Sequence, residues 1–487
     1  MCSKTDSPSF KDTTFCMSKS QERDTVPSDE TLEDMNDPLL DTFELSSFNR
    51  DGKSSAYEKV PGLSNESEEL RSSYLQTQRS KSSIFMAFMN MANSILGAGV
   101  IGQPFAIKNC GLVGGVLAIV LLSIMVDWTI RLIVINLKIS GKTSYQDSVE
   151  FAMGKKGKLL ILLTNGLFAF GGCIGFSIII GDTIPHVLRA FFPGHEGLFH
   201  RNVIITLVTC FVSLPLSLNR DISKLSKASM LALFSMVVIV VIVLIKGPLI
   251  EASYKGNFST GALLITPRIF QGISVISFAL VCHHNTSFIY FSLKTPSLKR
   301  FDRLTHISCF ISMIFCFIMG YSGFLVFRNK TKGNILNNFP GGDRAINVAR
   351  FCFGFNMLTT FPLEIFVLRD VIRDLIFFNK DDGQPVILSS RLHFLITIAM
   401  VFSTMGISLI TCNLGALFEL IGATTASLMA YILPPSVNLM LVGSQKSWRE
   451  KAPHYACIAF GFSIMIISST QTILTSLNGG DEKHCDV

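Results

Sequence analysis

The chain has 487 residues, of which 49% are hydrophobic and only 16% are charged. Soluble domains carry about 25% charged residues, so this composition excludes an ordinary soluble protein and indicates a membrane protein. The formal net charge is +7, although residues 1–81 hold 16 acidic and only 10 basic side chains. The basic excess therefore lies in the apolar remainder, where it belongs to loops beside the bilayer and does not indicate nucleic-acid binding.

Residues 1–81 differ in character from the rest of the chain. They are rich in Ser, Thr, Asp and Glu and show no periodic hydrophobic pattern. Because they cannot bury enough apolar surface to offset the entropy of ordering, we predict a disordered acidic cytoplasmic tail. Its serines and the motif YEKV at 57–60 are candidate sites for signalling or sorting partners, although such tetrapeptides arise often by chance. No apolar signal-peptide core is found in this segment.

The chain from residue 82 to 475 alternates long uncharged apolar runs with short charged loops. A helix needs about 20 apolar residues to cross the hydrocarbon core, so we predict an all-α polytopic membrane domain of about eleven helices. A short luminal or extracellular C-terminus, 476–487, follows it. The expected spans are 83–107, 112–137, 159–188, 202–219, 227–246, 269–293, 304–327, 347–368, 392–412, 415–442 and 454–475.

The basic residues predict how these spans are oriented. If the N-terminus is cytoplasmic, the inner loops and flanks hold 19 Lys and Arg and the outer ones hold 12, in agreement with the positive-inside rule. Glycosylation sequons at Asn257 and Asn329 then lie in outer loops and are predicted to be modified. A third sequon, at Asn285, falls inside a span and should be inaccessible.

The first span contains an unusual concentration of helix-breaking residues. The stretch NSILGAGVIGQP, 93–104, includes Gly97, Gly99, Gly102 and Pro104. An interior glycine costs about 1 kcal/mol relative to alanine and a proline about 3 kcal/mol. Close helix packing is one explanation for the glycines. Proline and a matching feature in the sixth span favour the other explanation, an unwound helix.

That matching feature is the stretch ISFALVCHHNTSFIYFSL, 276–293, in which two imidazoles and an asparagine interrupt an apolar run. It lies five spans after the first, as expected of transporters with two inverted repeats and a discontinuous helix in each. Unwound backbone offers amide donors to a carboxylate and carbonyl oxygens to a cation or ammonium group. A small zwitterion such as an amino acid suits both, although other organic anions remain open.

Four segments carry a family resemblance: MANSILGAGVIGQPFAIKNCGL, SFALVCHHNTSFIYFSL, LTTFPLEIFVLRDVI and FELIGATTASLMAYILPP. Together they resemble the amino acid/auxin permease family, especially its sodium-coupled neutral and its fungal vacuolar amino acid transporters. The CHHN run and DTIPHVL are similar to the eleventh member of the sodium-coupled group and its fungal relatives. The resemblance implies a five-plus-five inverted repeat of the amino acid–polyamine–organocation type, with broken first and sixth helices.

By motif, the resemblance implies a cation site at Asn93 and Thr360, with Thr359 as the adjacent alternative. Amide and hydroxyl oxygens are hard neutral ligands that suit Na⁺. A threonine inside a span also commonly bonds back to its own helix, which is the competing interpretation of Thr360. The coupling ion is Na⁺ or H⁺, because the fungal relatives are associated with protons; no other metal and no cofactor is expected.

Position within the two interrupted spans predicts the substrate site. Ser94, Gly97 and Gly99 are expected to contact the carboxylate end of the substrate. Ser277 and Phe278 of the sixth span are expected to form the opposite wall.

Four titratable side chains inside spans are candidates for proton coupling. His283 and His284 titrate near neutral pH, but hydrogen bonding between helices explains them equally well. Glu364 and Glu419 have no obvious cation nearby, and an unpaired charge inside a membrane is costly.

Three further charged residues have expected structural roles. Asp127 and Arg131 lie four residues apart and should pair on one helix face. Asp182 should lie at the wetted outer end of the third span.

These features favour secondary active transport of neutral amino acids by alternating access, in an endomembrane such as that of the vacuole or lysosome, with the plasma membrane and the endoplasmic reticulum as alternatives. The alternatives are an amino-acid sensor that signals through the acidic tail, or a receptor or channel. Deletion of the tail should abolish signalling by a sensor without affecting uptake. We expect no enzymatic activity, because no nucleophile–base pair or metal-ligand cluster is evident in the sequence.

Overall fold

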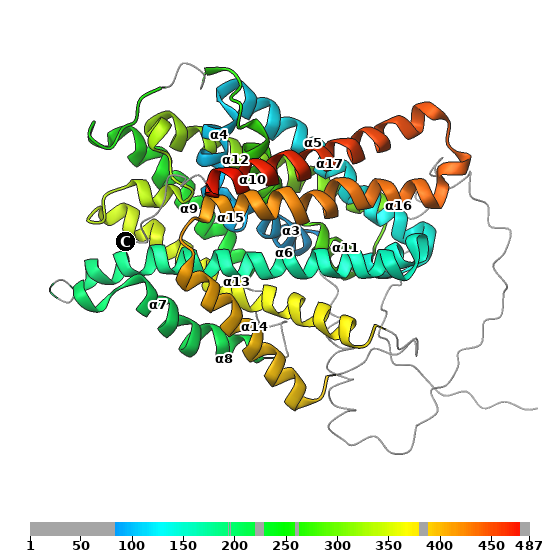
Figure 1. Cartoon of the computed structure of the whole chain (residues 1–487), viewed down its shortest axis with the longest axis horizontal. Coiled ribbons are helices and arrows are strands. Elements are labelled where there is room, and N and C mark those ends of the chain that lie inside the picture. Colours follow the sequence, from blue (N-terminus) through cyan, green and yellow to red (C-terminus); the bar gives the residue numbers. More distant parts are fainter. Residues whose placement is uncertain are drawn as a thin grey trace, which may run out of the picture. The chain divides into compact units, whose positions relative to one another are not determined.

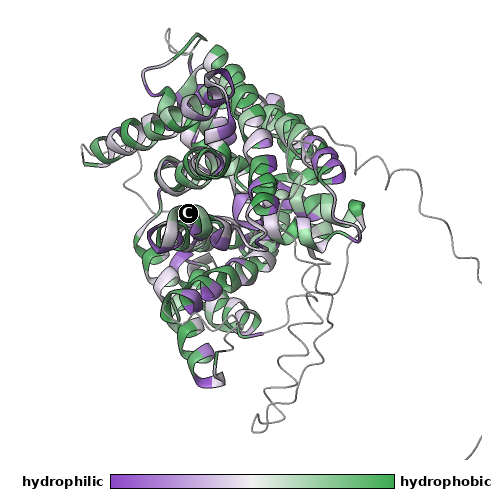
Figure 2. Cartoon of the chain, turned by 90° about the vertical axis from the view of Figure 1, so that its right-hand side faces the viewer, coloured by the Kyte–Doolittle hydropathy of each residue, from purple (hydrophilic) through white to green (hydrophobic). Residues whose placement is uncertain are grey.

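The computed structural model describes residues 83–477, except for 193, 195, 220–227, 259–262 and 379–387. The predicted tail, with its sorting motif, lies outside these residues, as does nearly all of the C-terminal segment 476–487. The described residues form a bundle of helices (Figure 1), whose long members consist mainly of hydrophobic residues (Figure 2).

The helices of the first five spans and their connections are α3 (Ile84–Leu96), α4 (Gln103–Cys110), α5 (Leu112–Ser140), α6 (Tyr145–Phe191), α7 (Arg201–Val208), α8 (Leu214–Ser217) and α9 (Ala228–Leu249). The remaining helices are α10 (Ile269–Leu280), α11 (Thr286–Ser292), α12 (Leu298–Phe327), α13 (Arg344–Ile376), α14 (Ser390–Ile410), α15 (Leu414–Ile421), α16 (Leu433–Val442) and α17 (Trp448–Leu477).

The predicted polytopic all-α architecture is confirmed. Among the described residues, ten helical segments are long and apolar enough to cross a membrane. A shorter apolar segment, Arg201–Ser217, takes the place of the predicted fourth span. Several helices are longer than predicted, because an apolar run marks the hydrocarbon core whereas a helix continues beyond it.

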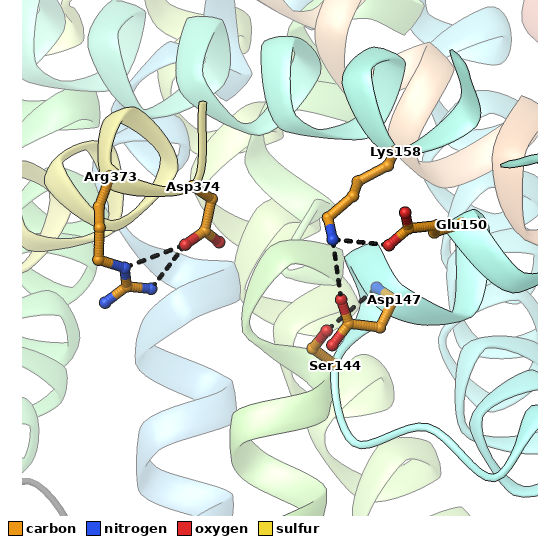
Figure 3. Close-up of polar contacts among 6 residues, drawn as sticks. All are labelled: Ser144, Asp147, Glu150, Lys158, Arg373 and Asp374. Atoms are coloured by element: carbon orange, nitrogen blue, oxygen red, sulfur yellow. Dashed lines mark hydrogen bonds and ion pairs between the residues drawn. The ribbon is translucent and has the colours of Figure 1, made fainter. Parts of the chain in front are cut away.

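The largest difference in helix length is in the third span, where α6 begins 14 residues before the predicted start at 159. Gly154 adopts a left-handed φ of 70° and bends the chain there. Lys158, after the bend, pairs with Glu150 at 2.6 Å and with Asp147 at 3.6 Å, both before it (Figure 3). Ser144 caps this first part by accepting from the Asp147 amide. A capped, polar helix therefore leads into the apolar span.

The sixth span lies in the middle of the bundle. Every residue of α10 from Gln271 to Leu280 is buried, and α10 packs against α4, α5, α15 and α17. Elsewhere α13 packs along α6 and α9, and α17 runs beside α16 (Figure 1). The interrupted sixth span therefore lies in the centre of the bundle, where a binding site between the helices would form.

The tenth span is also irregular, which the sequence did not predict. Two π-helical turns, Gly422–Ala426 and Leu428–Ile432, separate α15 from α16. A Cβ atom on Gly422 would lie 1.8 Å from the Ser274 carbonyl oxygen of α10. Glycine is therefore required here, because the two backbones touch.

The charged pairs follow the prediction in one case and differ in the other. Arg131 pairs with Asp127 at 3.1 Å on one face of α5, as predicted. Asp182 is not wetted: its side chain is only 6% exposed and pairs with Arg201 at 3.3 Å. The expectation of wetting was wrong because α7 places Arg201 over this carboxylate, and Asn337 donates to its other oxygen.

Candidate substrate and ion site

The first span is interrupted as predicted. Helix α3 ends at Leu96, and Gly97 leaves the helical region with φ −53° and ψ −136°. A single 3-10 turn, Ala98–Gly102, leads into α4, which has Pro104 in its first turn. A proline at that position costs little, since the amide it lacks would be unpaired in any case.

The sixth span is interrupted at the predicted place. Helix α10 ends at Leu280, and Val281 is extended with φ −78° and ψ 116°. His283–Asn285 form a 3-10 turn before α11 resumes. Both broken segments therefore change from helix to non-helical backbone inside the bundle.

The interruption of the first span packs closely against the sixth span at Gly99. A Cβ atom on Gly99 would lie 2.4 Å from the Cα and Cβ atoms of Ala279 in α10. A Cβ atom on Gly102 would meet Phe418 at 3.1 Å, whereas one on Gly97 would find only the Asn93 carbonyl oxygen at 3.6 Å. The glycines thus have separate uses: Gly97 stands where the helix ends, and Gly99 permits close packing of the two spans.

Asn285 joins the two interruptions through its side chain. Its Nδ2 atom donates to Ser94 Oγ at 3.3 Å and lies 2.9 Å from His284 Nε2. The same His284 Nε2 is 3.7 Å from Glu364 Oε1 on α13. Ser94, Asn285, His284 and Glu364 therefore form a polar row, here called the central polar row, that connects α3, the sixth span and α13.

Aromatic rings lie beside the central polar row. Phe168 of α6 is 5.1 Å from the His284 ring and 5.7 Å from Phe278, measured between ring centroids. Phe278 in turn stacks on Phe418 at 4.4 Å. Phe278 was predicted as a wall residue, whereas Phe168 was not, because nothing local in the sequence brings α6 to the sixth span. Asn285 was noted as interrupting the sixth span but was not predicted as a site residue.

Ser277 has a different environment from Phe278. It is fully buried, and its hydroxyl oxygen accepts from the Tyr431 hydroxyl at 3.0 Å. This hydrogen bond therefore joins the sixth span to the tenth. The substrate role of Ser277 stays a prediction.

The candidate cation ligands lie on α3 and α13. The Asn93 side chain is half-buried and, among the described residues, makes no hydrogen bond. The hydroxyls of Thr359 and Thr360 each donate to the Asn356 carbonyl at 2.9 Å, and Thr360 also lies 3.1 Å from Asn356 Oδ1. The Thr360 hydroxyl therefore donates its proton to its own helix, as the competing interpretation expects. Its oxygen retains lone pairs with which it can still bind a cation.

His283 occupies a separate polar contact. Its Nε2 atom lies 2.9 Å from the Thr129 hydroxyl, which itself donates to the Met125 carbonyl at 2.9 Å. When the hydroxyl donates to that carbonyl, the imidazole is the donor and carries its proton on Nε2; in the other tautomer the hydroxyl donates to Nε2. His283 therefore has a defined role in joining the sixth span to α5.

Glu419 is surrounded by neutral donors. Its carboxylate accepts from Asn109 Nδ2 at 2.8 Å, Gln271 Nε2 at 3.1 Å and Thr472 Oγ1 at 3.0 Å. These donors come from α4, α10 and α17, so one carboxylate on α15 connects both broken spans to the tenth and eleventh. Its partners were not predicted, since they come from three distant parts of the chain.

Two further predicted positions lie away from these contacts. Asn257 and Asn329 are exposed, and the Asn257 amide donates to Asn329 Oδ1 at 2.8 Å, so their loops are adjacent. Their glycosylation stays a prediction. Within the described part of the chain, His, Cys, Asp and Glu residues nowhere gather in groups of three or more that could hold a metal ion.

Comparison with known proteins bears on these features. The family model described as transmembrane amino acid transporter protein matches residues 80–474. "Vacuolar amino acid transporter 2" of Saccharomyces cerevisiae is 61% identical over 421 residues, covering 85% of this chain and 88% of the yeast protein. "Putative sodium-coupled neutral amino acid transporter 11" of Danio rerio is 33% identical over 405 residues, covering 82% of this chain and 88% of that protein.

Proposed function

Since the chain belongs to the family of transmembrane amino acid transporter proteins, we propose that it is a secondary active transporter of neutral amino acids. That membership confirms the resemblance read from its sequence motifs. Transport would be coupled to Na⁺ or H⁺ and would proceed by alternating access, with the ion gradient acting through different affinities in the two states.

The observation that carries this proposal is the meeting of two interrupted spans around Gly99 and Ala279. Backbone groups without helical partners are costly in a bilayer unless another group pairs with them. The substrate carboxylate would use amide donors near Gly97 and Gly99 together with the Ser94 hydroxyl, and Phe278 would border the side chain. In the case of Na⁺ coupling, Asn93 with Thr360 or Thr359 would supply the side-chain ligands.

The proposed location is an endomembrane, with the N-terminus in the cytoplasm and the loops of Asn257 and Asn329 on the luminal side. The support is the excess of basic residues in the inner loops and the yeast relative, which is named for the vacuole.

Uptake into proteoliposomes tests the function. The purified full-length chain is supplied with neutral, acidic and basic amino acids under an imposed Na⁺ gradient, an imposed H⁺ gradient, or neither. We expect neutral amino acids to accumulate only when one gradient is present. Absence of accumulation and of exchange for every amino acid, while protein-free vesicles stay tight, would overturn the proposal.

The sodium alternative has its own test. If Na⁺ is the coupling ion, Asn93→Ala and Thr360→Ala should raise the Na⁺ concentration needed for half-maximal uptake. Unchanged cation-dependent uptake in both variants would remove these residues from the ion site.

A further inference from the structure

The central polar row contains two side chains, Glu364 and His284, that the described residues leave incompletely hydrogen-bonded. Glu364 receives no hydrogen bond from any described residue, and its Oε2 atom is buried. His284 is also buried, and its Nδ1 atom has no partner among the described residues. Buried polar atoms are nearly always hydrogen-bonded to protein or to water, so these two facing side chains have capacity for a further bound group.

The orientation of the two groups indicates what that ligand is. When the Asn285 amide group donates to His284 Nε2, this nitrogen carries no proton to donate to Glu364 Oε1, which lies 3.7 Å away. A carboxylate without a donor in a poorly solvated site is unfavourable. One bound proton removes the problem: either a carboxylic acid faces the imidazole, or the Asn285 amide turns away from Nε2 and an imidazolium faces the carboxylate.

We propose that His284 and Glu364 together bind the single proton that this protein carries with its substrate. This inference rests on the proposed function and names its coupling ion. The proton enters from one side of the membrane, forms an N–H or O–H bond within the pair, and leaves to the other side. Nothing is oxidised or reduced.

The surroundings of the pair supply no competing charge among the described residues. Among the described residues, the only ion-pair partner of Glu364 is His284. From α6, the neighbouring titratable group is the Cys173 thiol, and from the sixth span it is His283, whose Nε2 atom contacts the Thr129 hydroxyl. Helix α3 contributes the neutral Ser94 through Asn285. Because these elements supply no other charge to neutralise Glu364, a bound proton is the charge that balances it.

The same row explains how the proton and the substrate are coupled. Asn285 contacts both His284 and Ser94, and Ser94 lies in the last turn before the first interruption. A change of charge at the pair alters which groups Asn285 can bond to. The substrate and the proton would then each bind better when the other is present, as thermodynamic reciprocity requires.

The test uses proteoliposomes of the full-length protein and an equimolar mixture of tritiated alanine, leucine and glutamine. Two quantities are measured: accumulation driven by an imposed pH gradient without Na⁺, and exchange of internal for external amino acid without any gradient. We expect Glu364→Gln and His284→Gln to lower gradient-driven accumulation by about tenfold or more while exchange stays within about threefold. Retained exchange also shows that a variant is folded.

Glu419→Gln and His283→Gln are the matched controls, because each changes the same kind of residue away from the pair: the Glu419 carboxylate accepts from three side chains, and His283 Nε2 contacts the Thr129 hydroxyl. Both should keep accumulation that responds to the pH gradient. The inference is overturned if the original protein exchanges amino acids but ignores the pH gradient, or if Glu364→Gln still accumulates them. Loss of gradient-driven accumulation in both controls would also overturn it. If the original protein neither accumulates nor exchanges, the proposed function itself fails.

Discussion

Glu364 and Glu419 are both acidic side chains inside the bundle, but their hydrogen-bond partners differ. Glu419 accepts from three neutral side chains on three other helices. Glu364 accepts no hydrogen bond from the described residues and faces an imidazole at 3.7 Å. A carboxylate that is fully hydrogen-bonded contributes to structure, whereas one without donors is available to a ligand.

The two regions around these carboxylates also differ in backbone. Glu364 faces the sixth span where that span is interrupted, beside the unwound turn at His284. Glu419 lies within α15, which ends at Ile421 before the first π-helical turn, and its donors lie on α4, α10 and α17. The helical break beside His284 thus coincides with a carboxylate that lacks donors, as expected of a site that exchanges partners during transport.

The largest loss of stability is expected from Glu419→Ala, which removes the carboxylate oxygens. Glu419→Ala leaves three buried donors without an acceptor, and each such group costs about 1–3 kcal/mol. Thermal unfolding in detergent should therefore show a much lower midpoint for Glu419→Ala than for Glu364→Ala, which breaks no hydrogen bond of the described residues. Glu419→Gln, which keeps one acceptor oxygen, should fall between Glu419→Ala and the original protein. Equal losses from the two alanine variants would remove the distinction between these carboxylates.

The next largest effect, a loss of uptake, is expected from substitution of a glycine in the first interruption. Gly99→Ala places a methyl group 2.4 Å from Ala279, and overpacking of this kind costs about 1–3 kcal/mol. Uptake by Gly99→Ala should fall strongly, because the two broken spans must move apart. Gly97→Ala is the matched control, since its methyl group meets only a carbonyl oxygen at 3.6 Å. A larger loss for Gly97→Ala than for Gly99→Ala would contradict the separate uses of the two glycines.

A smaller effect is expected from two serines that were both predicted to bind substrate. Ser94 belongs to the central polar row, whereas the Ser277 hydroxyl is bonded to Tyr431. Ser94→Ala should raise the KM for neutral amino acids several-fold. Ser277→Ala should leave the KM unchanged and cost about 1 kcal/mol of stability, the usual value for one hydrogen bond. A raised KM for Ser277→Ala would restore the original prediction for that residue.

The sequence predicted the features that depend on local chemistry. Apolar length located the spans, and the glycines with Pro104 located the first interruption, because helix breaking is a property of the residues themselves. Pairing of Asp127 with Arg131 followed from a spacing of four within one helix.

Contacts between distant segments could not be predicted in the same way. The donors of Glu419 lie on three other helices, and Arg201 reaches Asp182 from α7. Phe168 contacts His284 only because α6 passes the sixth span. A single sequence contains no spacing that relates these residues.

The smallest effect is expected at the edge of the membrane domain, where Asp343 precedes α13. Burial raises the pKa of this carboxyl, but its bonds to Lys246 and to the amides of Ile346 and Ala345 outweigh burial and lower the pKa below its ordinary value. A lowered pKa means stability that is present above the unfolded pKa of about 3.9 and is lost as the pH falls through the folded pKa.

Asp343→Asn keeps an acceptor for the helix cap and removes the charge that Lys246 pairs with. At pH 7 it should cost less than about 1 kcal/mol, the usual range for a partly exposed ion pair. Unfolding midpoints of the variant and the original protein should remain separated at pH 5 and converge only as the pH falls below the lowered folded pKa of Asp343, where both carry a neutral side chain. Asp343→Ala also removes the cap, so its difference should persist at low pH. A gap between Asp343→Asn and the original protein that closes already at pH 5 would mean that the Lys246 pair does not depress the pKa, and that mild acidification weakens this edge of the bundle.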